Sequence, residues 1–252
     1  MNSATVRNLL VRGMLAGLAA GVLALVVAYL LGEPSVDSAI GFEEAHSHAH
    51  GHEVELVSRS LQSTAGLATG VLVYGVSFGG IAALAYCFAL GRVGRFGPRA
   101  TALLLSGTAL LAVYVVPFLK YPANPPSVGD PDTIGKRTTL YFLMMVLSVL
   151  LAVGATILGK RLAPGLGTWY ATVVAVAAFA VVIGIAYEFL PVINEVPKDF
   201  PATLLWRFRL SALAIQTVLW AGFGLVFGEL AERMLNPRPA TAPSGRSVPA
   251  AN

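Results

Sequence analysis

Charged residues are scarce in this chain of 252 residues, at 12% of the sequence against 56% hydrophobic residues. Soluble domains carry about 25% charged residues, because these keep the surface hydrated. The mean hydropathy of +0.73 is also far above that of a soluble domain. We therefore exclude an ordinary soluble domain and expect a protein for which lipid is the main solvent.

Cysteine and the common catalytic motifs are also lacking. The single cysteine, Cys87, lies in an apolar run, which excludes an intramolecular disulfide and a metal centre made of several thiolates from one chain. The sequence has no Walker A motif, so we expect no ATP hydrolysis by this chain. It has no H-E-x-x-H pair, Ser/His/Asp arrangement or paired carboxylates inside an apolar run. We therefore expect that the protein is not an enzyme.

The basic residues give a formal net charge of +4 and a pI near 9.4. They stand singly or in small groups at the ends of apolar runs, which is the pattern of a membrane topology signal. Such a distribution does not favour binding to nucleic acid, which is contacted by a continuous basic surface. We expect the lipid bilayer, and no nucleic acid, as the partner of this surface.

What the sequence does contain is a set of apolar runs, each long enough to cross a hydrocarbon core in about 20 helical residues. We predict an all-α fold, a polytopic bundle of transmembrane helices with about six crossings, formed by residues 1–235. Glycines recur at spacing four in the first two runs, which lets helix backbones approach closely in lipid. The predicted crossings are residues 10–32, 66–90, 100–119, 138–159, 168–189 and 209–230.

The links between the runs alternate in character. Links such as GRVGRFGPR and GKRLAPGLG are short and basic, whereas the other three are long and contain most of the acidic residues. The positive-inside rule then predicts cytoplasmic termini and three outer loops. Residues 236–252, rich in Pro, Ala and Ser, are predicted to be a disordered cytoplasmic tail.

The first outer loop, residues 33–60, contains every histidine of the chain. Small residues separate the histidines, and glutamates flank them. Imidazole and carboxylate groups suit divalent cobalt, nickel, zinc and copper. We predict metal ligands at His46, His48, His50, His52, Glu43 and Glu44. Ser35 is a candidate N-cap for a short helix that precedes the histidines.

Three further glutamates are candidate cation ligands at the membrane boundary. Glu188 lies at the end of a predicted crossing, where an ionisable group is costly enough to indicate a partner or a role. Glu33 follows the first crossing, and Glu195 lies in the third outer loop. Arg207 and Arg209 are the expected partners if Glu188 or Glu195 forms a structural salt bridge instead.

Several stretches within residues 7–232 resemble the CbtA family of predicted bacterial cobalt transporter subunits. These are LLVRGMLAGLAAGVLA, GEPSVDSAIGFEEAH, HSHAHGH, KYPANPPSVGDPDTIGKRT and NEVPKDFPATLLWRFR. The resemblance implies cobalt uptake for cobalamin synthesis across the bacterial inner membrane. It also implies a small membrane partner with a His-rich end, CbtB, and a protein often described with five helices.

Two functional hypotheses follow. The first is a permease, or permease subunit, for a divalent metal ion, in which the outer histidines and glutamates capture the ion. Cobalt rests on the resemblance alone, and the residues themselves equally allow nickel or zinc. The second is a metal-binding membrane scaffold or sensor that does not transport. The absence of acids, lysines and histidines near the middle of the crossings favours this second hypothesis.

Overall fold

The computed structural model describes residues 2–46, 58–126 and 128–237, and these residues form helices without strands. Five helical stretches are long and apolar enough to cross a membrane: Ser3–Ala45, Arg59–Ala89, Pro98–Lys120, Ile134–Phe189 and Ala202–Leu235. The elements in chain order are α1 (Ser3–Val27), η1 (Ala28–Gly32), α2 (Glu33–His46), α3 (Arg59–Leu61), η2 (Gln62–Gly66), α4 (Leu67–Ala89), α5 (Pro98–Ala109), η3 (Leu110–Val115), α6 (Val116–Lys120), η4 (Pro131–Thr133), α7 (Ile134–Phe189) and α8 (Ala202–Leu235).

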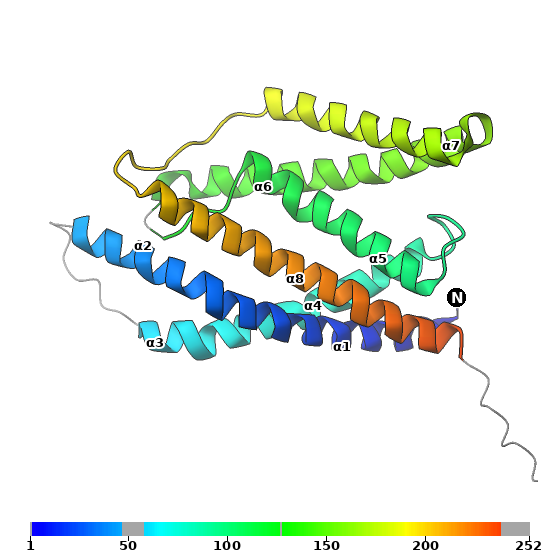
Figure 1. The fold of residues 1–252 in the computed structure, drawn as a ribbon, viewed down its shortest axis with the longest axis horizontal. Coiled ribbons are helices and arrows are strands. Elements are labelled where there is room, and N and C mark those ends of the chain that lie inside the picture. Colours follow the sequence, from blue (N-terminus) through cyan, green and yellow to red (C-terminus); the bar gives the residue numbers. More distant parts are fainter. Residues whose placement is uncertain (1, 47–57, 127, 238–252) are drawn as a thin grey trace, which may run out of the picture.

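The longest helix, α7, is a hairpin of two helical arms. Its 56 residues reverse direction at Gly167, where φ is 76° and ψ is 158°. This backbone conformation is essentially restricted to glycine. The arms, residues 134–166 and 168–189, run back along each other (Figure 1). The five helical stretches therefore make six passes, because α7 passes twice. This confirms the predicted helical bundle of about six crossings.

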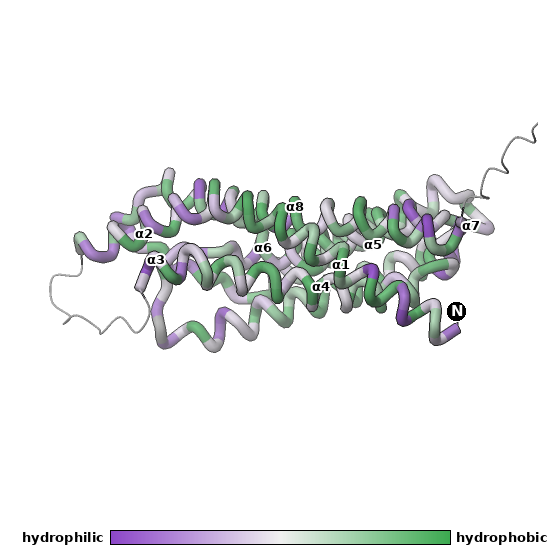
Figure 2. The backbone as a smooth tube through the Cα atoms, turned by 90° about the horizontal axis from the view of Figure 1, so that it is seen from below, coloured by the Kyte–Doolittle hydropathy of each residue, from purple (hydrophilic) through white to green (hydrophobic). Residues whose placement is uncertain are grey.

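The surface of the bundle is apolar over its middle part. Hydrophilic residues gather towards the two ends of the long axis, and hydrophobic stretches lie between them (Figure 2). Large hydrophobic side chains on the outside are widely exposed, for example Ile81 at 71% and Phe88 at 72%. A soluble protein does not expose a belt of this kind, whereas lipid tails cover it without cost.

Helices α1 and α4 pack with their backbones in contact. A Cβ atom built on Gly17 would lie 2.1 Å from the carbonyl oxygen of Gly75, and one on Gly79 would lie 2.2 Å from that of Gly13. No other residue fits at such a distance, so the spacing of four in these glycines serves the contact between these two helices. Gly70, by contrast, has no neighbour within 4 Å, so its place in the pattern has no packing role.

Helix α8 completes the core between α1, α4 and α5. Phe78 of α4 meets Trp220 of α8 edge to face at 4.5 Å between ring centroids, and Tyr86 meets Phe227 at 4.9 Å. The hairpin α7 packs beside this core, on α6 and η3, through contacts that include Val116, Met144 and Ile183. The hairpin is therefore the most lipid-exposed part of the bundle.

Two π-helical segments carry the helices past prolines. In η1 the Glu33 N–H bonds to Ala28 O, and in η3 the Val116 N–H bonds to Leu111 O. Pro34 lies two residues after the end of η1, and Pro117 lies two residues after the end of η3. The wider turn relieves the clash between a proline ring and the preceding carbonyl groups, so the helix continues.

This continuity corrects one prediction about the first outer loop. Helix α2 follows η1 without a break, so Ser35 lies inside a helix and is not an N-cap. Its hydroxyl instead donates to the carbonyl of Leu31 at 3.4 Å. Helix α2 thus extends the first transmembrane helix by about 20 Å beyond Glu33.

The three long polar links lie at one end of the bundle, and both described chain ends lie at the other (Figure 1). At the end with the chain ends, Arg12 donates to the carbonyl of Leu230 at 3.1 Å, and Arg99 pairs with Glu229 at 2.7 Å. Lys160, in the first arm of α7, donates to the carbonyl of Arg92 at 2.8 Å. The short basic links are therefore held together at this end. We call the opposite end, with residues 33–46, 58–60, 121–126, 128–133 and 190–201, the acidic end.

Candidate functional site

The acidic end is a small folded unit rather than three separate loops. Ala39 of α2, Val128 of the second link and Phe200 of the third are all buried in one cluster. Phe42 meets Phe200 edge to face, with 5.0 Å between ring centroids. Apolar contacts therefore fix α2 over the other two links.

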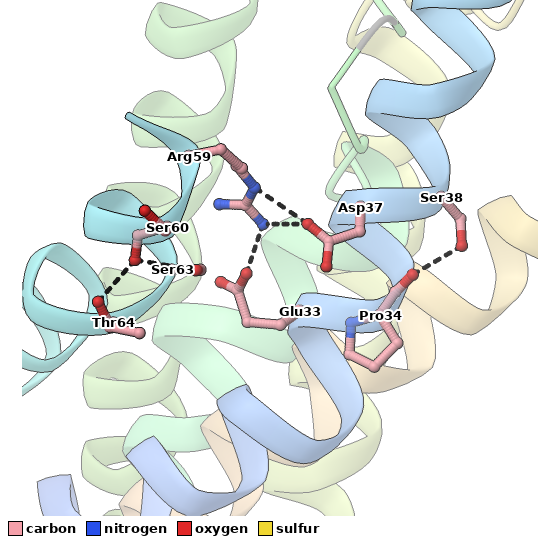
Figure 3. A network of polar contacts seen from close by, with 8 residues as sticks. All are labelled: Glu33, Pro34, Asp37, Ser38, Arg59, Ser60, Ser63 and Thr64. Atoms are coloured by element: carbon pink, nitrogen blue, oxygen red, sulfur yellow. Dashed lines mark hydrogen bonds and ion pairs between the residues drawn. The ribbon is translucent and has the colours of Figure 1, made fainter. Parts of the chain in front are cut away.

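Arg59 joins both sides of the histidine-containing link (Figure 3). Its guanidinium donates to Asp37 Oδ1 from Nε at 3.0 Å and from Nη2 at 2.8 Å, and it forms an ion pair with Glu33. The Glu33 side chain is only 14% exposed. Since Arg59 follows the histidines and Glu33 and Asp37 precede them, this contact brings the two flanks of residues 47–57 together.

Glu195 connects the third link to the start of α7. Thr133 Oγ1 donates to Glu195 Oε1 at 2.5 Å, and the Asp130 N–H donates to Oε2 at 3.0 Å. Arg137 Nε lies 3.3 Å from Oε2, an ion-pair distance, but the angle does not make a hydrogen bond. The pKa of Glu195 is lowered from its ordinary value, first by the Thr133 hydrogen bond and then by that of Asp130. The carboxylate is therefore held in its charged form.

Arg209, at the start of α8, holds the proline-rich second link. It donates to the carbonyl of Ala123 at 3.3 Å and to Asn124 Oδ1 at 3.0 Å. The sequence led us to expect Arg207 or Arg209 beside Glu195, but the partner is Arg137. Part of this pairing could have been predicted from the sequence, because Arg137 follows a Pro-Asp-Thr turn that also supplies Thr133, the other side chain that contacts Glu195.

A cavity of about 660 Å³ lies between these two arginines. The second link forms its rim, and η3, the first arm of α7, the third link and α8 form its walls. Three charged residues line it, namely Arg137, Glu195 and Arg209, together with the aromatic residues Tyr114 and Tyr141. The acidic end therefore contains an open cavity as well as an exposed acidic surface.

The predicted metal ligands are distributed over this end. Glu43 and Glu44 are exposed near the end of α2, which closes at His46, and Glu188 is exposed at the end of α7. Glu33 and Glu195 are engaged by arginines. His48, His50 and His52 lie outside the described residues. Within residues 2–46, 58–126 and 128–237, no three His, Cys, Asp or Glu side chains are grouped as a metal site.

Two buried serine hydroxyls inside the bundle bond to neighbouring helices. Ser211 donates to the carbonyl of Leu31 in η1 at 2.8 Å, and Ser148 donates to the carbonyl of Ala112 in η3. Both acceptors belong to π-helical segments, where the usual backbone ladder is disturbed. The hydroxyls therefore satisfy carbonyl groups that would otherwise be costly in lipid.

An apolar six-pass bundle with an acidic, folded end defines a multi-pass membrane protein of the kind that handles solutes or ions at one membrane surface. The family model described as "Probable cobalt transporter subunit (CbtA)" matches residues 6–232. The chain belongs to this family, which assigns it a transport role with a metal ion as substrate. No curated protein and no solved structure matches the chain.

Proposed function

We propose that the protein is a membrane permease, or a permease subunit, that takes up divalent cobalt for cobalamin synthesis. The observation that carries this proposal is the gathering of acidic side chains at one end of the bundle. Of the 11 acidic residues that the structure describes, nine lie at that end, and Glu229 and Glu232 lie in the last part of α8, away from it. Negative charge on one face attracts cations and raises their local concentration.

The histidine-containing link is the proposed capture element. His46, His48, His50 and His52 supply imidazole nitrogens, and Glu43 and Glu44 supply carboxylate oxygens. The exposure of Glu43 and Glu44 near the end of α2 supports this role, because a metal ion reaches them from solvent. Glu33, Glu188 and Glu195 are the proposed oxygen ligands at the mouth of the bundle.

Of these three, Glu188 is the best suited to receive an ion. It is exposed, and no ion pair joins it to another described residue. Glu33 and Glu195 already neutralise arginines, so a metal ion must displace Arg59 or Arg137 to bind them. We therefore propose that Glu188 acts before the other two.

Three finer assignments belong to the same proposal. Cobalt is proposed over nickel and zinc because of the family match. The ligands themselves do not select cobalt, because the intrinsic affinity of such ligands rises from cobalt through nickel to copper. The positive-inside rule assigns the end with Arg12, Arg99 and Lys160 to the cytoplasm, so the protein lies in the inner membrane with cytoplasmic termini. A small His-rich membrane protein of the CbtB type is the proposed partner.

A second function, that of a metal-binding scaffold or sensor without transport, is favoured by a separate observation. The buried polar side chains of the described bundle are Ser35, Thr101, Ser106, Ser148 and Ser211, and none of them is ionisable. A dehydrated cation needs oxygen or nitrogen ligands throughout its path. In the scaffold the ion binds at the acidic end and goes no further.

Accumulation of labelled cobalt in cells distinguishes the two functions. We expect uptake by the intact chain, a strong loss with Glu188→Ala, and loss only at low external cobalt when the four histidines become alanine. A Glu232→Ala variant, at the opposite end, is the matched control and should leave uptake unchanged. If the intact chain never raises intracellular cobalt, with or without its small partner, the scaffold is the correct function.

Capture should also depend on pH. The imidazole groups bind metal only when neutral, and their ordinary pKa is about 6.5. We expect cobalt binding at low metal to fall as the pH drops below about 6. The chain with the four histidines replaced should lose this dependence, and an unchanged profile would contradict capture by histidine.

A further inference from the structure

The cavity beside Arg137 and Arg209 has the wrong charge for a cation. Its three charged lining residues are two arginines and one glutamate, so its walls carry two positive charges against one negative charge. Both oxygens of Glu195 already accept hydrogen bonds, from Thr133 and from the backbone of Asp130. The only carboxylate in this space is therefore occupied, and the remaining charge is positive.

Donor groups in the cavity remain available. A guanidinium carries five N–H donors. The structure uses those of Arg209 for the two bonds to Ala123 and Asn124, from Nε and Nη2, and no hydrogen bond joins its Nη1 to another described residue. Arg137 also lines the cavity, and no hydrogen bond joins its Nη1 or Nη2 to another described residue, while its Nε is buried at 3.3 Å from Glu195 Oε2. Unsatisfied guanidinium donors in a low-dielectric space call for an anion.

The walls of the cavity are amphipathic. The lining includes polar residues, among them Asn124 and the two arginines, as well as the aromatic residues Tyr114, Tyr141 and Phe142. Phe142 is 55% exposed and Ile134, which also lines the cavity, is 54% exposed. Both belong to the lipid-facing side of α7, so the cavity borders the lipid. A ligand with an anionic group and an apolar body fits this arrangement.

We propose that this cavity binds a phosphate group, through Arg137 and Arg209, at the level of the lipid headgroups. Arginine recognises phosphate with parallel N–H donors, and Tyr114 and Tyr141 line the same cavity. The phosphate comes either from a phospholipid headgroup or from solution. The site is distinct from the proposed metal ligands, apart from Glu195, which shapes it by holding Arg137.

Binding to the full-length protein, stripped of lipid in dodecyl maltoside, tests this proposal. Three probes are added separately: dioleoylphosphatidylglycerol, dioleoylglycerol, which lacks the phosphate, and inorganic phosphate. We expect saturable binding and a raised unfolding temperature with phosphatidylglycerol and not with dioleoylglycerol. An equal effect of inorganic phosphate identifies a soluble anion as sufficient. If neither phosphate source binds, or if dioleoylglycerol acts equally well, the proposal is wrong.

Variants locate the site. Arg137→Gln and Arg209→Gln should each weaken phosphate binding about tenfold or more, which corresponds to the loss of a charge-assisted hydrogen bond. Arg207→Gln removes an exposed arginine outside the cavity and should leave the affinity unchanged. Arg137→Lys keeps the charge and serves if Arg137→Gln does not fold, and it should weaken binding less. An equal loss with Arg207→Gln would mean general surface attraction and would overturn the proposal.

Discussion

At the scale of single residues, Glu195 is the acidic side chain with the clearest structural task. It accepts hydrogen bonds from Thr133 and from the Asp130 backbone, and it balances Arg137. Such a carboxylate ties two links of the acidic end together only while it is charged. Its protonation should therefore loosen this end.

The pH dependence of stability follows from the lowered pKa of Glu195. The contribution of a carboxyl whose pKa is lowered by folding is fully present above its unfolded value, about 4.3, and is lost as the pH falls through the lower folded value. Thermal unfolding between pH 6 and pH 3 should show this loss for the intact chain. Glu195→Gln should be less stable at pH 6 and flatter in the acid range. Glu44→Gln, at an exposed position, is the control, and an equal flattening there would contradict the assignment.

At this end, the sequence indicated which carboxylates lie near the helix ends but not which arginines pair with them. The polar links identified Glu33, Glu188 and Glu195 as boundary carboxylates. Their partners depend on how three distant links fold against each other, and nothing local in the sequence encodes that. Arg59 pairs with Glu33, 26 positions away, and Arg137 pairs with Glu195, 58 positions away. His48, His50 and His52 lie outside the described residues, and the four histidine ligands stay a prediction.

At the scale of elements, the contact between α1 and α4 depends on the absence of side chains. Gly79→Ala introduces a Cβ that meets the carbonyl of Gly13 at 2.2 Å, and backbone atoms cannot move aside as a side chain does. We expect a loss of about 1–3 kcal/mol in the free energy of unfolding, measured by denaturation in mixed micelles. Gly154→Ala, which has no neighbour within 4 Å, should stay within about 1 kcal/mol of the intact chain. Equal losses in both variants would contradict the close approach.

The reversal of α7 depends on one backbone conformation. Gly167 has open space around its Cα, so a substitution there tests the backbone angles and not the packing. Gly167→Ala should cost about 1–3 kcal/mol, because alanine rarely adopts a φ of 76° with an extended ψ. Gly165→Ala, two residues earlier and also without neighbours, should have little effect. The measurement is the same denaturation in mixed micelles.

The elements were the part of the fold that the sequence predicted best. Apolar runs give the crossings directly, because the bilayer requires a fixed length of apolar helix. The helix start predicted at Ser35 was wrong, because a π-helical segment lets the first helix continue past Pro34. A serine next to a proline looks the same in the sequence whether a helix begins there or continues. The glycine pattern indicated close approach by the first two runs but did not show that they approach each other, and it did not separate Gly70, which has no neighbour within 4 Å.

At the scale of the whole molecule, the two ends differ in charge and in construction. Six passes bring the links of the acidic end to one membrane side and the basic links to the other. The alternation of basic and acidic links indicated this arrangement from the sequence alone, because the topology signal is compositional. What composition did not indicate is that the acidic end folds into a unit with its own buried residues, Ala39, Val128 and Phe200.

Labelling of single cysteines in whole cells checks the six passes. With Cys87→Ala as the background, Asp132→Cys and Lys198→Cys should react with a membrane-impermeant maleimide. Arg95→Cys and Gly165→Cys should react only after permeabilisation, because the hairpin of α7 turns on the opposite side. Labelling of Gly165→Cys together with Asp132→Cys in intact cells would mean that the first arm of α7 does not cross the membrane, which would contradict the six passes.

The position of α8 has a consequence for synthesis of the protein. This helix is made after α1, α4 and α5, yet it fills the space between them, with Phe223 and Phe227 almost fully buried. Domains and helices made first are available to fold first. The pair of α1 and α4 therefore assembles early through its glycines, while the place of α8 stays open until α8 has been made. A chain truncated before residue 202 lacks α8 and leaves the core surfaces of α1, α4 and α5 exposed, so we expect cellular quality control to degrade it.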